Sequence, residues 1–109
     1  MFQKIISKEI PANIYYEDDL CMAFDDIRPQ APVHILLIPK KEIPSHREVE
    51  SKDQSLMGHL ILKAKEIALK VGLEKGWRLV VNTGDDGGQT VHHIHIHILG
   101  GRPMQWPPG

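Results

Sequence analysis

The residues with the clearest chemical potential are histidines at alternate positions of one segment. His93, His95 and His97 are separated by single isoleucines, and they account for three of the seven histidines in the chain. In an extended strand, alternate side chains point to the same face and lie about 6.6–7 Å apart. Near neutral pH an imidazole can act as a nucleophile, a proton donor or a cation. The pattern therefore predicts acid–base and nucleophilic chemistry on an anionic substrate, with the isoleucines packed on the core.

The same histidines could instead bind a metal ion. Zinc takes four tetrahedral nitrogen, sulfur or oxygen ligands, and histidines two positions apart on a strand can supply a pair of them. A straight strand does not readily bring all three rings to one ion, so Cys21 or carboxylates would have to complete the set. A solvated polar face is a third interpretation, which we disfavour because histidine is not a preferred strand residue.

The loop that precedes the histidines favours an anionic substrate over a metal ion. Residues 82–90 contain three glycines, whose backbone N–H groups can approach an oxyanion closely. Thr90 adds a hydroxyl and Asn82 an amide, and such donors suit a phosphate but not zinc, which needs acceptors. Asp85 and Asp86 would repel a phosphate, so we expect them to point outward.

The elements that must position these groups are mostly strands. Runs rich in apolar, β-branched and aromatic residues, bounded by Pro, Gly and Asp, predict five of them. The expected strands cover residues 14–17, 20–26, 33–38, 77–82 and 91–99. Apolar residues at helical spacing in residues 2–6 predict a short helical turn, which Pro11 must end.

One long amphipathic helix is expected between the strands. Its apolar stripe runs from Leu56 to Val71 at helical spacing, a capping pattern at residues 51–54 precedes it, and Gly72 ends it. We expect His46 and His59 to be structural or solvated. Several strands with one long helix indicate an antiparallel α+β domain in which the helix covers one face of the sheet. The other face must be functional or buried by a partner.

Size and composition limit the function classes further. The 109 residues fit one domain, residues 1–109, and the formal net charge of −1 provides no field that would attract nucleic acid or an anionic membrane. A single cysteine excludes an intrachain disulfide and agrees with a reducing compartment. The N-terminus lacks the apolar run of a signal peptide, and no stretch reaches the ~18 apolar residues of a membrane span. We therefore expect a cytoplasmic protein without nucleic-acid or membrane partners.

Several segments resemble the histidine triad (HIT) superfamily of nucleotide hydrolases and transferases. The repeat of histidine and an apolar residue in 93–98 carries the resemblance, and further segments are similar to the Hint branch of that superfamily, the histidine triad nucleotide-binding proteins. These further segments are residues 24–27, 29–34, 38–41, 87–90, 100–102 and 106–109. The resemblance covers nearly the whole chain.

The resemblance implies a HIT-like fold and a specific activity. The fold is a five-stranded antiparallel sheet with one long helix and a short N-terminal helix, and the sheets of a homodimer join into one. Hint proteins are purine nucleoside phosphoramidases that hydrolyse adenosine 5′-monophosphoramidate and AMP joined to amines such as lysine. No metal or other cofactor is implied, and unknown protein partners remain possible.

The resemblance also assigns roles to individual residues. His95 resembles the nucleophile, which would form a covalent nucleotidyl-histidine that water then cleaves. His97 and Thr90 resemble the groups that hold the phosphate and assist the leaving amine. His34 and His93 resemble supporting histidines.

The nucleotide itself would contact a wider set of residues. Asp26 matches the carboxylate that accepts from the ribose hydroxyls, and Trp106 resembles a tail residue that approaches the partner's site. The purine pocket and the phosphate loop are matched by Phe2, Ile5, Phe24, Ile27, Leu36, Asn82, Gly88 and Gln89.

Two positions depart from the family's pattern. Thr90 stands where many Hint proteins have serine, so a methyl group and a stiffer side chain accompany the hydroxyl. Asp25 adds a second carboxylate beside Asp26 and could weaken binding of anionic nucleotides. The alternatives are a dinucleoside polyphosphate hydrolase or nucleotidyl transferase of another HIT branch, a nucleotide-binding regulatory module, and a metal-binding protein.

Overall fold

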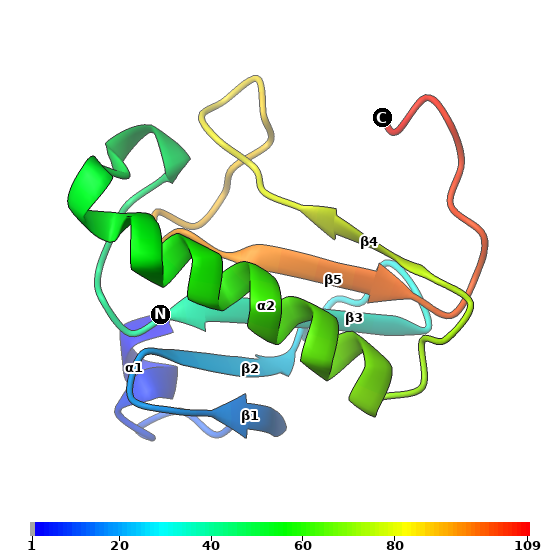
Figure 1. Cartoon of the computed structure of the whole chain (residues 1–109), viewed down its shortest axis with the longest axis horizontal. Coiled ribbons are helices and arrows are strands. Elements are labelled where there is room, and N and C mark those ends of the chain that lie inside the picture. The colour runs from blue at the N-terminus through cyan, green and yellow to red at the C-terminus, as the bar shows by residue number, and fades with distance from the viewer. Residues whose placement is uncertain (1) are drawn as a thin grey trace.

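The computed structural model describes residues 2–109 and confirms the α+β fold (Figure 1). Five strands form one antiparallel sheet, the long helix crosses one of its faces, and a short helix lies at the N-terminus. In chain order the elements are α1 (Phe2–Ile6), β1 (Ile14–Glu17), β2 (Cys21–Asp25), β3 (Val33–Pro39), the 3₁₀ turns η1 (His46–Glu48) and η2 (Ser51–Asp53), α2 (Gln54–Lys70), β4 (Trp77–Val80) and β5 (Ile96–Gly100).

Two of the predicted site residues, His34 and His97, lie on adjacent inner strands of the sheet. The strand order is β1-β2-β3-β5-β4, so β3 and β5 have a neighbour on each side. Leu36 of β3 pairs with His97 of β5, and His34 pairs with Leu99. Residues directly opposite each other share a face, as do residues two apart on one strand. His34 and His97 are therefore diagonal neighbours on one face of the sheet.

Strand alternation divides the buried residues into two cores on opposite faces. The core on the α2 side contains Cys21, Ala23, Ile35, Leu37, Leu60, Ala64, Ile67, Ala68, Leu73, Ile96 and Ile98. The core on the α1 side contains Phe2, Ile5, Met22, Phe24, Leu36 and Ile38. His34 and His97 lie on the face that α1 covers.

The long helix follows the predicted stripe, with Leu60, Ala64 and Ile67 buried against the sheet. Its start differs from the expected capping pattern at residues 51–54. The Asp53 carboxylate accepts the backbone N–H of Glu50 at 3.0 Å, so the cap lies one residue earlier, on η2. The segment between β3 and α2 contains the two 3₁₀ turns η1 and η2.

The prediction of a strand over residues 91–99 was wrong in its first half, because β5 begins only at Ile96. β3 ends at Pro39, which has no N–H with which to extend the ladder. The Pro39 carbonyl instead accepts from the His93 ring at 2.8 Å, and the Ile94 N–H donates to Ile43 at 2.7 Å. His93 and Ile94 thus make these hydrogen bonds outside the sheet, and only His97 of the three alternating histidines lies in a strand.

β2 and β4 are also shorter than predicted, since they span Cys21–Asp25 and Trp77–Val80. Within residues 2–109, none of the helices combines the length and the apolar character that crossing a bilayer requires.

Candidate functional site

Three histidine rings meet on the α1 side of the sheet, and we refer to His34, His95 and His97 as the histidine cluster. The Nε2 atom of His34 lies 2.8 Å from Nδ1 of His97, and the ring centroids of His95 and His97 are 4.9 Å apart. His34 and His95 are buried, while His97 is partly exposed. The structure thus brings together three of the five residues predicted to be catalytic.

The hydrogen bonds of His34 determine which nitrogens of two rings carry protons. The backbone N–H of Gln30 donates to Nδ1 of His34 at 3.0 Å, so that nitrogen must be an unprotonated acceptor. Neutral His34 then carries its proton on Nε2, and this N–H donates a hydrogen bond to Nδ1 of His97. Neutral His97 is left with its proton on Nε2. The Asp26 carboxylate lies 3.4 Å from Nε2 of His34, farther than His97 does.

The proton of His95 is placed by the backbone of its own segment. Nδ1 of His95 lies 2.6 Å from the carbonyl oxygen of His93. A carbonyl oxygen can only accept, so Nδ1 must donate. When the ring is neutral, Nε2 of His95 therefore carries a lone pair and no proton. This is the form in which an imidazole can act as a nucleophile.

His93 lies beside the histidine cluster and supports it. Its Nε2 donates to the carbonyl of Pro39 at 2.8 Å, and its Nδ1 lies 3.3 Å from the amide nitrogen of Gln3 in α1. The ring is buried and directed at structural groups on both sides. These contacts fix the position of the His93 backbone carbonyl, which accepts the hydrogen bond from Nδ1 of His95.

Burial keeps the histidine cluster neutral. Burial lowers the pKa of His95 below its ordinary value, although its hydrogen bond to His93 opposes the shift. Burial and the neighbouring His95 and His34 lower the pKa of His97 to about 4. Burial also lowers the pKa of His34, against the attraction of Asp26. All three rings are therefore neutral at pH 7, which agrees with the proton placement above.

Phe2 of α1 provides part of this burial. Its ring packs edge-on against His95 with centroids 5.2 Å apart, and it also contacts His93 and Phe24. The predicted purine-pocket residues Phe2, Ile5, Phe24 and Leu36 are all buried in the α1-side core. Phe2 contacts His95 and Leu36 pairs with His97, so this core borders the histidine cluster.

Two other predicted nucleotide-binding residues, Ile27 and Trp106, are exposed and lie outside this core. Ile27 is 86% exposed and Trp106 is 82% exposed. Trp106 belongs to the C-terminal tail, which extends away from the sheet beyond β4 and β5 (Figure 1).

The glycine loop uses most of its polar groups internally. The side chain of Asn82 donates to the Gly87 carbonyl at 2.7 Å. The Gln89 side chain accepts from the Gly84 N–H at 3.0 Å and donates to the carbonyls of Pro44 at 2.8 Å and Val91 at 3.0 Å. These two amides therefore hold the loop in shape and tie it to neighbouring segments.

The backbone of the same loop is also partly engaged. The N–H groups of Gly88 and Gln89 donate to the carbonyls of Asp85 and Gly84 at 3.0 Å each. Asp85 and Asp86 are exposed, as expected, and so is Thr90.

Two groups of side chains among the described residues could hold a metal ion. In the first, ligand atoms of Asp26, His34 and His97 converge. An ion there would have to replace the hydrogen bond between the two histidines. Cys21 lies on the opposite face of the sheet, in the α2-side core. It therefore does not complete a metal site with the alternating histidines, as one form of the metal interpretation of the sequence required.

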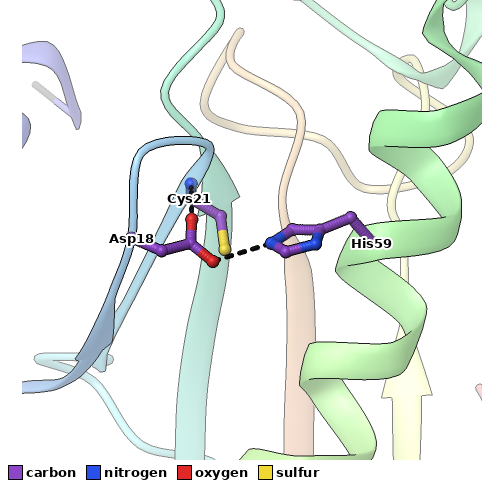
Figure 2. A group of neighbouring side chains, drawn as sticks. All are labelled: Asp18, Cys21 and His59. Carbon is purple, nitrogen blue, oxygen red and sulfur yellow. Dashed lines mark hydrogen bonds and ion pairs between the residues drawn. The ribbon is translucent and has the colours of Figure 1, made fainter.

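The second group consists of Asp18, Cys21 and His59, and it connects the β1–β2 turn to α2 (Figure 2). The Asp18 carboxylate already accepts from Tyr16 and His59 at 2.7 Å, and from the backbone N–H groups of Leu20 and Cys21 at 2.8 Å. Burial raises the pKa of Cys21 to about 12, so its thiol stays protonated. The group is satisfied as a structural tie, and the expectation for His59 is met.

An open groove of about 570 Å³ lies between η1 and the glycine loop. It is lined by charged residues of both signs, including Arg47, Glu48, Asp85 and Asp86. No member of the histidine cluster lines it, so we do not assign it to the chemistry of the site.

The groups that the sequence does not reveal are backbone atoms. The carbonyls of His93 and Pro39 and the N–H of Gln30 orient the site histidines, yet any residue type could supply them. Gln3 carries no sequence signal either, since its contact with His93 depends on how α1 docks. Only the folded arrangement identifies these partners.

Comparison with known protein families gives one match over most of the chain. The family model described as the HIT domain matches residues 7–104. An uncharacterised HIT-like protein from Synechocystis sp. is 60% identical over 109 residues, which is 100% of this chain and 96% of that protein.

Solved structures agree with this match. A HIT family hydrolase from Legionella pneumophila is 51% identical and superimposes with a TM-score of 0.98 over 100% of this chain and 98% of that one. A histidine triad nucleotide-binding protein from Candida albicans is 26% identical, with a TM-score of 0.82 over 97% of this chain and 81% of that one.

Proposed function

This chain belongs to the HIT domain family, and we propose that it hydrolyses purine nucleoside phosphoramidates through a covalent nucleotidyl intermediate on His95. The observation that supports this most directly is the 2.6 Å contact between Nδ1 of His95 and the His93 carbonyl. It leaves an unprotonated nitrogen on a buried, neutral ring. A hydrolase relative and a nucleotide-binding relative support the reaction type and the substrate class.

In the first step, Nε2 of His95 attacks phosphorus, a nitrogen–phosphorus bond forms to the ring, and the bond to the amine breaks. The His95 ring then carries a positive charge, which the His93 carbonyl stabilises through the Nδ1 proton. The amine takes up one proton as it leaves. In the second step water attacks phosphorus, its oxygen stays on the nucleotide, and one proton is released as His95 returns to its neutral form.

His97 and Thr90 have different roles in these steps. Neutral His97 presents its Nε2 proton and can donate a hydrogen bond to a phosphoryl oxygen, which stabilises charge that develops there. Giving that proton away would leave an imidazolate, so His97 is not the source of the proton on the amine. The exposed Thr90 hydroxyl both accepts and donates, so it can pass a proton from solvent water to the leaving nitrogen as it receives another from that water.

Residues beside the histidine cluster bind the nucleoside. Asp26 is half-buried next to His34, with Oδ1 accepting the Arg28 N–H at 2.8 Å. Its other oxygen can accept from the ribose hydroxyls. The purine would pack against the α1-side core, where Phe2 and Phe24 meet edge to face with centroids 5.8 Å apart. Apolar and aromatic lining of this kind suits a flat, hydrophobic base.

His95→Asn tests the proposed nucleophile. We expect phosphoramidate hydrolysis to be lost while the Kd for AMP stays within a few-fold, because asparagine keeps polarity and size but has no nucleophilic nitrogen. Mass spectrometry of the wild-type protein quenched during turnover should show one added nucleotidyl group on His95.

His46→Asn is the matched control, since His46 is exposed on η1 and takes no part in the site. Near-normal turnover by His95→Asn would remove His95 from its role. Hydrolysis of a dinucleoside polyphosphate in preference to the phosphoramidate would favour another branch of the family, and AMP binding without any turnover would favour a regulatory binding module.

A further inference from the structure

We infer that the backbone N–H of Gln30, anchored by Arg102, is a positioning group that makes His97 present a proton to the substrate. The inference rests on the proposed function for its catalytic consequence. Its structural part, the proton position on two rings, stands on hydrogen bonds alone. Neither Gln30 nor Arg102 lies in the histidine cluster, and both are exposed.

The loop that contains Gln30 is held at several points. The Gln30 side chain donates to the Arg28 carbonyl at 3.0 Å, and the Arg28 N–H donates to Asp26 at 2.8 Å. The Asp26 N–H donates to the carbonyl of His34 at 3.0 Å, where the loop joins β3. These bonds direct the Gln30 N–H at Nδ1 of His34, which it meets at 3.0 Å.

Arg102 connects the end of β5 to the loop that contains Gln30. It follows β5 by two residues, and its guanidinium donates to the carbonyl of Gln30 at 3.0 Å. From Gln30 the contacts continue to His34 and then to His97, which is itself a residue of β5. The strand that carries His97 therefore also positions the loop that sets its proton.

The alternative proton arrangement conflicts with this geometry. A proton on Nδ1 of His34 would point at the Gln30 N–H, placing two donors face to face across 3.0 Å. Only in that arrangement could His97 carry its proton on Nδ1 and keep the contact with His34. Its Nε2 would then present a lone pair to the substrate, which repels an anionic phosphoryl group. The Gln30 N–H thus selects the form of His97 that attracts substrate.

Nitrogen NMR of protein with ¹⁵N-labelled histidine measures this directly at neutral pH. Long-range proton–nitrogen correlations distinguish the two neutral imidazole forms. We expect Nε2-protonated rings for His34 and His97 and an Nδ1-protonated ring for His95. A His97 ring protonated on Nδ1 would overturn the inference whatever the enzyme's activity. Correct proton positions without phosphoramidate turnover would leave the inference standing and reject the proposed function alone.

Gln30→Pro removes the N–H that meets His34, together with the side-chain bond to the Arg28 carbonyl. We expect mixed proton forms of His34 and His97. We also expect a kcat lower by about 10–100-fold, the size of effect seen when a group that orients a metal-binding histidine is removed. The Kd for AMP should change less than kcat. Gln30→Ala is the matched control, because it loses the same side-chain bond but keeps the N–H. We expect it to retain the Nε2-protonated forms of His34 and His97 and a kcat much closer to wild type.

Arg102→Gln provides a second test that does not depend on the proline variant folding. Losing the anchor should allow the loop to move, so the His34 and His97 signals should show partial loss of the Nε2-protonated form and kcat should fall. Arg102→Lys, which keeps a donor, should recover part of the rate. A folded Gln30→Pro protein, or Arg102→Gln, with the wild-type His97 spectrum and kcat would show that the loop does not set the proton.

Discussion

Burial of the His95 ring controls when it can act as a nucleophile. Attack requires the neutral ring, and burial lowers its pKa below the ordinary value of 6.5. Because the pKa is lowered, protonation occurs only at more acidic pH than in a free histidine. The ring is therefore fully available at pH 7 and above.

We expect kcat/KM for a nucleoside phosphoramidate to stay constant from pH 8 down to about 6.5, the ordinary histidine pKa, and to fall at lower pH. Phe2→Ala should move this acid limb toward higher pH, since removing the Phe2 ring exposes His95 to water. A pH–rate profile for each protein, corrected for titration of the substrate, provides the measurement. A wild-type limb at or above pH 6.5 would contradict the burial argument.

Among single residues, Thr90 and Asp25 are the departures from the family pattern whose effects the site geometry helps to interpret. Thr90 is exposed at the end of the loop, so its additional methyl has room. The Asp25 carboxylate accepts from the side chain of Asn13 at 2.8 Å. That bond ties Asp25 to the N-terminal segment, and we expect it to lessen the repulsion of a nucleotide if one binds beside Asp26.

At the scale of elements, the shape of the glycine loop, residues 82–90, depends on a close backbone contact. Gly87 packs so closely on the Thr83 backbone that any side chain would overlap it. The Gly87 carbonyl also receives the Asn82 side chain at 2.7 Å. A glycine is therefore required at this position by space.

Gly87→Ala should destabilise the protein by about 1–3 kcal/mol, the usual cost of inserting a methyl where there is no space, and should reduce turnover by displacing Thr90. Gly58→Ala is the matched control, because Gly58 is exposed in α2 with nothing near its added methyl. We expect it to stabilise the protein by about 0.5–1 kcal/mol through helix propensity. Urea unfolding at one protein concentration measures both, and equal stabilities would refute the close packing.

At the scale of the whole molecule, β4 pairs with β5 on one side and leaves its outer edge free within the described residues. β4 is at one edge of the strand order, and an edge strand offers free N–H and C=O groups to another chain. Val81, Leu62 and Leu69 are large apolar residues that remain 43–58% exposed. We propose that a second copy covers these surfaces and joins the two sheets into one.

Sedimentation should therefore give a mass of twice 12.3 kDa at micromolar concentration. Val81→Lys should shift the protein toward the monomer, since a charge would be buried in the proposed interface. Leu20→Lys, at an exposed position of the β1–β2 turn, should leave the mass unchanged. A monomeric wild-type protein would reject the proposal and leave Trp106 without a partner's site to approach.

The sequence alone determined which side chains share a face and which helix covers the sheet. Side-chain direction is a local property of strands and helices, so strand alternation and the helical stripe of α2 were sufficient where those elements form. Ile96 and Ile98 of β5 lie in the α2-side core, as predicted, while His97 between them lies on the other face.

Only the tertiary structure decided where β5 begins and which nitrogen of each ring holds its proton. Both depend on backbone groups that distant segments supply: Pro39 ends the ladder and binds His93, and Gln30 donates to His34. The proline that ends β3 is visible in the sequence, but the partners of its carbonyl and of the Gln30 N–H are not, because any residue type provides a carbonyl and all but proline provide an N–H. Their roles arise when the register of β3 against β5 and the docking of the loops place them within hydrogen-bond distance.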